Sequence, residues 1–325
     1  MTRRRVGVLG TCVWDVIYGR DVRSAPVQEW GGITYALAGF DAALPNDWEV
    51  VPIIKVGDDL AAEARGFFSS MRRLAPGSGP IAVPYPNNRV ELRYSDDERR
   101  SEVLTGGIPG WTWQGLQPLV AGLDALYVNL ISGFELDLET ATLLRQHFAG
   151  PIYCDLHSLL LAVQPSGLRT PQPLPRANEW LRCFDVLQVN EDECALLAPD
   201  GMALAATAMA NGVQSLVVTL GPRGAVYFAP GHFARLADRR TGEARFAAGG
   251  ALRTERLAPA PDQVRVKGDP TGCGDVFGAT YFSRLLAGDI ITEALRAAMT
   301  AAARNVEHRG ATGLAHFLRG ELSPS

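Results

Sequence analysis

A glycine-rich segment near the C-terminus carries the strongest chemical signal in the sequence. Residues 269–275 read DPTGCGD and lead into a helical pattern. Glycines let the backbone approach a ligand closely, and free N–H groups at a helix start attract anions. We therefore predict that Gly272, Cys273 and Gly274 present amides to a phosphoryl group and that Asp275 accepts the proton of an attacking hydroxyl. The alternative is a tight turn followed by an N-terminal helix aspartate.

The elements that would position this segment alternate along the chain. Short apolar runs predict buried strands at residues 6–9, 50–54, 126–128, 152–153, 186–189 and 216–219. Helical patterns lie at residues 33–44, 58–71, 138–148, 191–197, 202–211, 274–286 and 291–308. This alternation predicts an α/β fold with a doubly wound, mostly parallel sheet and helices on both faces.

Two stretches, residues 17–33 and 82–104, break this rhythm. In the second, Val90, Leu92 and Tyr94 alternate with polar residues, which is typical of half-exposed antiparallel strands. We expect a single α/β domain over residues 1–325, with these two segments forming a small antiparallel β lid that excludes water from the site. The Pro-rich piece from Gln164 to Pro175 is predicted as a loop.

Composition favours a small-molecule partner. The 31 basic and 35 acidic residues are mixed along the chain and leave a formal charge of −4, which disfavours nucleic acid and anionic membranes as partners. The five cysteines are odd in number and scattered, so we do not expect disulfides. We expect a reducing, cytoplasmic location instead. No apolar stretch is long enough to predict a membrane span or a signal peptide.

The segment 269–275 resembles the C-terminal signature of the ribokinase-like (PfkB) carbohydrate kinase family, usually Asp-Thr-Thr-Gly-Ala-Gly-Asp. The resemblance implies that Asp275 is the catalytic base and that the amides of residues 272–274 form the anion hole. Asp269 and Thr271 match positions that often help to hold a monovalent cation such as K⁺. Pro270 and Cys273 replace a threonine and an alanine of the usual signature.

Two further motifs resemble the nucleotide side of the family's site. Asn190 and Glu193 match an Asn-x-x-Glu element that organises magnesium-bound water and phosphate, although the same pair is also a good helix capping box. Thr219, Gly221 and Gly224 match the strand and turn beside the nucleotide, although such a turn also occurs in ordinary β-hairpins.

The N-terminal part resembles the family's acceptor-binding elements. Asp15 would bind substrate hydroxyls, and Gly31 and Gly32 would let the backbone reach the sugar, although loop aspartates and Gly-Gly turns are often structural. Ala36 stands where the family usually has an acceptor-binding asparagine. Residues 155–157 read Asp-Leu-His where its sugar kinases often show Asp-x-Asn. Both departures bear on acceptor specificity, and His157 is either substrate-facing or structural.

Together these features imply an ATP-dependent kinase that phosphorylates a hydroxyl of a sugar, nucleoside or similar small polyol. We expect ATP and Mg²⁺ as cofactors, with the metal carried mainly by nucleotide phosphates because the histidines and cysteines show no zinc spacing. The resemblance also allows K⁺, and a homodimer formed through the lid. The alternatives are a vitamin-precursor kinase of the same fold and a non-catalytic sugar or nucleotide sensor.

Overall fold

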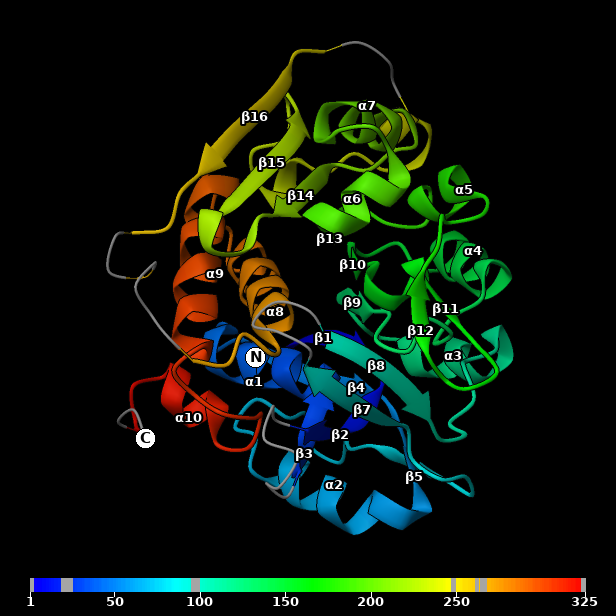
Figure 1. The fold of residues 1–325 in the computed structure, drawn as a ribbon. Coiled ribbons are helices and arrows are strands. Elements are labelled where there is room, and N and C mark those ends of the chain that lie inside the picture. The colour runs from blue at the N-terminus through cyan, green and yellow to red at the C-terminus, as the bar shows by residue number, and fades with distance from the viewer. Residues whose placement is uncertain are drawn as a thin grey trace.

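The computed structural model describes residues 3–18, 26–94, 100–246, 250–260, 263 and 268–322. Its centre is an eight-stranded sheet in the order β16-β15-β14-β13-β10-β9-β1-β4 (Figure 1). The strands are β1 (Arg4–Leu9), β4 (Trp48–Ile53), β9 (Ala125–Asn129), β10 (Ile152–Asp155), β13 (Val186–Asn190), β14 (Ser215–Thr219), β15 (Ala225–Pro230) and β16 (Leu252–Leu257). The strands from β4 to β14 are parallel, and β15 and β16 add in antiparallel fashion. The predicted doubly wound, mostly parallel sheet is confirmed.

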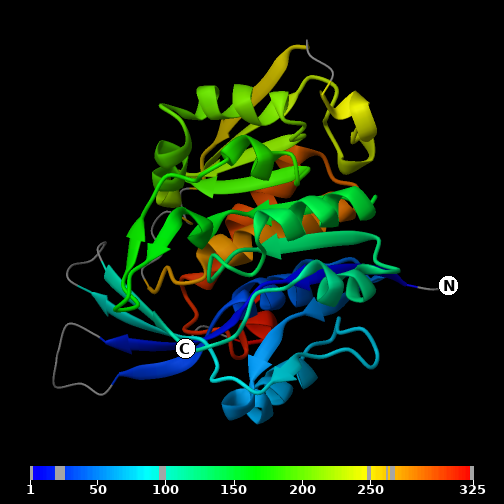
Figure 2. The same ribbon diagram turned by 90° about the vertical axis from the view of Figure 1, so that its right-hand side faces the viewer.

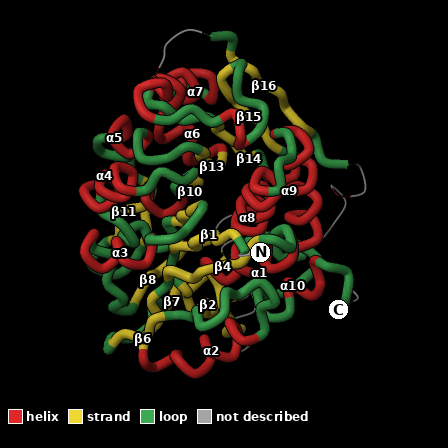
Figure 3. Tube along the Cα trace, turned by 180° about the vertical axis from the view of Figure 1, so that it is seen from behind, coloured by secondary structure: helices red, strands yellow, loops and turns green. Residues whose placement is uncertain are grey.

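Helices cover both faces of this sheet (Figure 3). They are α1 (Ile33–Ala43), α2 (Ala61–Ser69), α3 (Trp113–Val120), α4 (Leu138–His147), α5 (Ala177–Leu181), α6 (Glu191–Leu197), α7 (Gly201–Ala210), α8 (Cys273–Leu286), α9 (Ile291–Asn305) and α10 (Leu314–Leu318). Asp137, Asn190 and Asp200 begin α4, α6 and α7, and each side chain accepts a hydrogen bond from an amide of the first turn. Short 3₁₀ turns are η1 (Asp58–Leu60), η2 (His157–Leu160), η3 (Gly221–Arg223), η4 (Leu236–Asp238) and η5 (Gly242–Phe246).

Successive residues of the central strands point to opposite faces and so build two cores. On β9, Tyr127 packs in the core that includes α1, α8 and α9, whereas Leu126 and Val128 pack in the core that includes α4 and α7. Because both faces are buried, the strands read as nearly continuous apolar runs.

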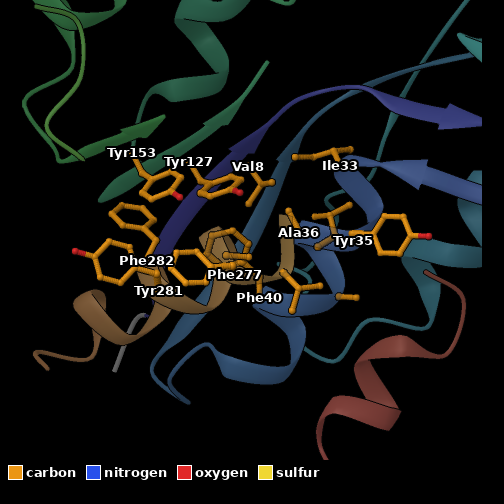
Figure 4. Close-up of a cluster of buried hydrophobic side chains, with 14 of the residues drawn as sticks. Val8, Ile33, Tyr35, Ala36, Phe40, Tyr127, Tyr153, Phe277, Tyr281 and Phe282 are labelled. Carbon is orange, nitrogen blue, oxygen red and sulfur yellow. The ribbon is translucent and has the colours of Figure 1, made fainter. Parts of the chain in front are cut away.

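An aromatic cluster joins the sheet to α1 and α8 (Figure 4). Tyr127 and Tyr153 on neighbouring strands stack with ring centroids 4.7 Å apart and planes 13° apart. Phe40 of α1 meets Tyr127 edge-on at 5.0 Å, and Phe282 of α8 lies 5.4 Å from Tyr153. These contacts fix α8 against β9 and β10 of the central sheet.

A separate four-stranded sheet stands off the main body, at the edge opposite the start of β1 (Figure 2). Its order is β3 (Val27–Gly32), β2 (Cys12–Tyr18), β7 (Arg89–Tyr94) and β8 (Arg100–Thr105). The outer pairs are antiparallel as predicted, but β2 pairs with β7 in parallel, which long connections permit and hairpin turns do not. The sheet begins at Cys12 rather than Ile17, and residues 19–25 and 95–99 of the predicted lid segments lie outside the described residues.

Two other small strand pairs complete the fold. Strands β5 (Lys55–Gly57) and β6 (Ile81–Val83) pair in parallel, so the start of the second predicted lid segment belongs to a different sheet. The Pro-rich stretch predicted as a loop contains β12 (Arg169–Pro171), which pairs with β11 (Leu161–Val163). This hairpin contacts β8, because the Leu104 amide donates to the Gly167 carbonyl at 2.8 Å.

Within the residues that the structure describes, no helix combines the length and the apolar character that crossing a bilayer requires.

Candidate active site

A cleft of about 210 Å³ lies between the carboxyl ends of the central strands and the four-stranded lid. Many of its lining residues are ones that the sequence singled out. These are Asp15, Gly32, Asp155, His157, Asn190, Glu193, Thr219, Thr271, Gly272, Gly274 and Asp275. Gly31, Cys273, Gly221, Gly224 and Asp269 were also singled out, but they lie beside the cleft rather than on its wall. A site at the carboxyl edge of a doubly wound sheet is where such folds bind ligands.

The glycine-rich loop closes against α1 at the start of α8. Gly272 has a φ of 77°, and a Cβ there would lie 2.2 Å from ring atoms of Tyr35, so the position requires glycine. The Cys273 amide donates to the Pro270 carbonyl at 3.1 Å, and the Cys273 thiol lies 3.4 Å from the Ala302 carbonyl, away from the cleft. The loop therefore turns Gly272 and Gly274 toward the cleft and Cys273 toward α9.

Asp275 is buried at the base of the cleft, with 9% of its surface exposed. The Asn129 side-chain amide donates to Asp275 Oδ1 at 2.6 Å. Asn129 ends β9 and is fully buried, so its rotamer is fixed by packing. Asn129 was not among the residues predicted from the sequence. One feature of the sequence could have identified it. Asn129 is a polar residue at the carboxyl end of an apolar strand, and side chains at that position reach a site at the carboxyl edge of the sheet.

Gln188 links three parts of the site. Its side-chain nitrogen donates to Asp155 Oδ2 at 2.8 Å and to the Gly274 carbonyl at 3.1 Å, and its oxygen accepts from the Tyr153 hydroxyl at 2.5 Å. Burial raises the pKa of Asp155 well above its usual range, and the nearby carboxylates of Glu193 and Asp275 raise it further. Burial therefore favours the neutral form of the Asp155 carboxyl group. Gln188 was not predicted either, because a single glutamine within an apolar run does not stand out from an ordinary buried strand.

Asn190 and Glu193 form the reciprocal capping box at the start of α6. The Glu193 amide donates to Asn190 Oδ1 at 2.8 Å, and both Glu193 carboxylate oxygens accept from Asn190 at 2.8 Å. The capping interpretation is confirmed; the pair also lines the cleft, and its role in the site stays a prediction. Burial raises the pKa of Glu193 to about 7.

On the lid side of the cleft, the backbone of β3 packs closely against Asp15. This residue is 5% exposed on β2, and a Cβ on Gly31 would lie 1.8 Å from its Oδ2 atom. Gly32 has a φ of 60° and faces the cleft. Gly31 therefore lets β3 pass beside the aspartate. Ala36 of α1 is buried in the hydrophobic cluster of Figure 4 and is not among the residues that line the cleft.

A buried ion pair completes the lid side. Arg169 of β12 lies 3.4 Å from a carboxylate oxygen of Glu102 on β8, and 4% of its side chain is exposed. Arg169 also donates to the Ser158 hydroxyl at 3.1 Å and to the Ile131 carbonyl at 2.9 Å. His157, with a φ of 36°, lines the same region. Arg169 thus ties the hairpin and the lid sheet together at the cleft wall.

Asp269 and Thr271 are joined to each other. Asp269 Oδ1 accepts from the Thr271 amide at 2.9 Å and from the Thr271 hydroxyl at 2.6 Å. The Thr271 carbonyl accepts from the Asn305 side-chain amide at 2.8 Å. Protein donors already bond to one Asp269 carboxylate oxygen and to the Thr271 carbonyl, and the monovalent-cation role of the pair stays a prediction. Across the described ranges, no three acidic, histidine or cysteine groups converge as a metal would require.

The turn after β14 places its three predicted residues differently. Thr219 ends the strand and lines the cleft. Gly221 and Gly224 have φ values of 55° and 92°, and a Cβ on Gly224 would lie 2.0 Å from the Leu257 carbonyl. Gly224 therefore allows β16 to approach the turn closely, which is a structural requirement.

Comparison with known families gives one match. The model of the pfkB family carbohydrate kinases matches residues 138–316, which is more than half of the chain and includes β10, β13, β14 and α8. Comparison with curated proteins gives no match.

Solved structures share the fold at low sequence identity. Ribokinase from Thermotoga maritima has a TM-score of 0.67 at 16% identity, covering 98% of this chain and 99% of that chain. A pyrophosphate-dependent kinase in the ribokinase family, complexed with a pyrophosphate analogue and myo-inositol, has a TM-score of 0.68 at 14% identity, covering 94% and 96%. Ribokinase from Arabidopsis thaliana, complexed with ribose and ATP, has a TM-score of 0.64 at 17% identity, covering 98% and 99%.

Proposed function

Because the chain belongs to the pfkB family of carbohydrate kinases, we propose that it transfers the γ-phosphoryl group of ATP to a hydroxyl of a sugar, nucleoside or similar small polyol. Family membership makes it a phosphotransferase with an alcohol group as acceptor. The observation that carries the finer proposal is local. A buried carboxylate, Asp275, and the loop backbone at Gly272 and Gly274 face one cleft beneath a lid.

In the proposed reaction Asp275 accepts the proton of the attacking hydroxyl. Asn129 fixes the orientation of the Asp275 carboxylate through the 2.6 Å hydrogen bond. The Cys273 amide, predicted to face the phosphoryl group, already donates to the Pro270 carbonyl, so this role falls to the Gly272 and Gly274 amides. With the positive end of the helix dipole, these two amides would stabilise negative charge on equatorial phosphoryl oxygens. Because the dipole also keeps the carboxylate weakly basic, proton transfer comes late.

The described residues fit a phosphorylated donor held mainly by backbone. Thr219 and the start of α8 border the cleft from one side, while Asp15, Gly32 and the lid border it from the other. Bound ATP with Mg²⁺ would supply the phosphoryl group and neutralise charge on it. Asn190 and Glu193 line the same cleft and would order water around such a metal. The lid would exclude bulk water as a competing acceptor.

The test is a turnover assay with ATP, Mg²⁺ and a panel of sugars, polyols, nucleosides and a vitamin precursor bearing a hydroxymethyl group. Pyrophosphate replaces ATP in a parallel series, because one structural neighbour uses it. Asp275→Asn keeps the shape of the side chain and should lower kcat by about 10²–10⁴-fold. Undiminished turnover in this variant would refute the assigned base. Binding of acceptor or nucleotide without any turnover would favour the sensor alternative.

A further inference from the structure

A second cavity, of about 710 Å³, lies at the amino edge of the central sheet. Its walls come from the end of α4, the segment that joins α5 to β13, and residues 239–246. Figure 2 shows η5, in yellow, on the same side as the start of β1 and away from the lid. The cavity therefore shares no wall with the candidate active site.

Three arginines converge on one carboxylate beside this cavity. Asp185 is fully buried and lies 2.8 Å from Arg145, 3.4 Å from Arg239 and 3.6 Å from Arg245. The arginine side chains are only 14%, 13% and 6% exposed. Three guanidinium groups and one carboxylate leave a net charge of +2 in a partly buried place, and uncompensated buried charge is costly.

Some of the guanidinium N–H groups of these arginines bond to the protein, and others face the cavity. Arg245 donates to the carbonyls of Gly212, Arg182 and Phe184, so its guanidinium is committed to the backbone. Arg239 uses one terminal nitrogen for the Ala149 carbonyl and the other for Asp185. Among the described residues, the Arg239 Nε atom has no acceptor, which leaves a donor at the cavity wall.

Arg182 brings a fourth guanidinium to the rim. Its Nε donates to Asn211 Oδ1 at 2.9 Å, and its two terminal nitrogens have no acceptor within the part of the chain that the structure describes. Of the two glutamates on the cavity wall, Glu179 is already paired with Arg176 at 2.6 Å, and Glu243 is exposed. Arg145 and Arg245 each have a lowered pKa because of burial and the neighbouring arginines.

We propose that this cavity binds the phosphate group of a small organic phosphate, such as a sugar phosphate or a nucleotide. A phosphate monoester carries about −1.5 to −2 charges at neutral pH, which matches the +2 of the cluster. Planar guanidinium forks are suited to phosphate oxygens. The volume of the cavity falls in the range of small-molecule binding sites. The apolar side chains of Phe148 and Phe246 line its wall and would contact the organic part of the ligand.

Isothermal titration calorimetry of the full chain tests the proposal with inorganic phosphate, ribose 5-phosphate and AMP as probes and neutral ribose as the blank. Arg182→Gln and Arg239→Gln each remove a charged donor from the cavity. The matched control is Arg296→Gln, an exposed arginine on α9 that does not line the cavity. At least one of the three phosphate-containing probes should bind both cavity variants about tenfold more weakly than it binds the parent protein. The same probe should bind the control variant as tightly as it binds the parent.

The outcomes separate the cavity from the cleft. A probe that binds the candidate active site alone would keep its affinity in Arg182→Gln and Arg239→Gln, and this result would overturn the proposal. The proposal would also be overturned if none of the three phosphate-containing probes bound. Preference for AMP or ribose 5-phosphate over inorganic phosphate would identify which organic part the wall accepts. Thermal unfolding midpoints of the variants, measured without probe, establish that each is folded.

Discussion

Asp275 depends on a neighbour that lies outside the glycine-rich signature. Asn129 arrives from β9, 146 residues away in sequence, and donates to Asp275 Oδ1. A carboxylate that can rotate spends less time aligned with the hydroxyl that it must deprotonate, so orientation contributes to rate.

The first prediction at this scale concerns Asn129→Leu. Losing the amide should lower kcat about tenfold or more, while the KM for ATP changes little, because Asn129 acts through Asp275 rather than on the nucleotide. Steady-state kinetics of the folded variant provide the measurement. A wild-type kcat in Asn129→Leu would show that the hydrogen bond is irrelevant to turnover.

The second prediction concerns Cys273. Burial raises the pKa of its thiol to about 11, so the thiolate forms in the folded protein only as the pH approaches that value. At pH 8, alkylation by iodoacetamide should therefore be slow at Cys273 and fast after denaturation, as mass spectrometry can follow. Cys273→Ala should retain activity within about twofold, because the side chain points toward Ala302 rather than the cleft. Rapid labelling at pH 8, or a large loss of activity in Cys273→Ala, would contradict this role.

At the scale of elements, the start of α8 is fixed by its fit against α1. The Tyr35 ring occupies the space that a side chain on Gly272 would need, whereas a Cβ on Gly274 would lie 3.8 Å from the nearest heavy atom, Gln188 Nε2. The lid is fixed differently, through the Arg169–Glu102 pair between β12 and β8. Packing therefore holds in place the end of the helix that we propose as the anion site.

Matched alanine substitutions test this fit. Gly272→Ala forces a β-carbon into a left-handed conformation and into the Tyr35 ring, and should lower the free energy of unfolding by about 1–3 kcal/mol. Gly274→Ala lies within the helix and in open space, so its stability should equal or exceed that of the parent by up to about 1 kcal/mol. Urea unfolding followed by circular dichroism gives both values. Equal destabilisation by the two substitutions would argue against the close packing of loop and α1.

At the scale of the whole molecule, Asp185 holds together the amino edge of the sheet. Its carboxylate accepts from the Ile152 amide at 2.8 Å, where β10 begins, and pairs with arginines from α4, from the end of η4 and from η5. One buried acid thus connects segments that are distant in sequence, at the end of the sheet opposite the cleft.

Asp185→Asn should therefore destabilise the entire fold. Among the described residues, Asp185 is the acid with which all three arginines pair. Removing its charge leaves buried positive charge and should cost about 3–5 kcal/mol. The matched control is Asp47→Asn, whose pair with Arg4 is half-exposed and should contribute less than about 1 kcal/mol. Chemical denaturation of both variants makes the comparison. If Asp185→Asn costs no more than the surface control, the cluster does not stabilise the fold.

Several features followed from local sequence alone. The apolar runs predicted the central strands from β1 to β14, because strands buried on both faces need continuous apolar side chains. The DPTGCGD segment predicted the loop and the start of α8, because glycine and a helix-start aspartate act over a few residues. The capping box at Asn190 was likewise predicted from four consecutive residues.

Tertiary structure decided what depends on partners far apart in sequence. It paired β2 with β7 in parallel and made a strand of Arg169–Pro171. It also brought Gln188 and Arg169 to the cleft and Asn129 to Asp275. An asparagine or glutamine in an apolar run carries no local mark of its hydrogen-bond partner, since that partner is chosen by the crossing of strands and helices. For the same reason the convergence of three arginines on Asp185 cannot be read from their spacing, because only the folded chain brings their charges together.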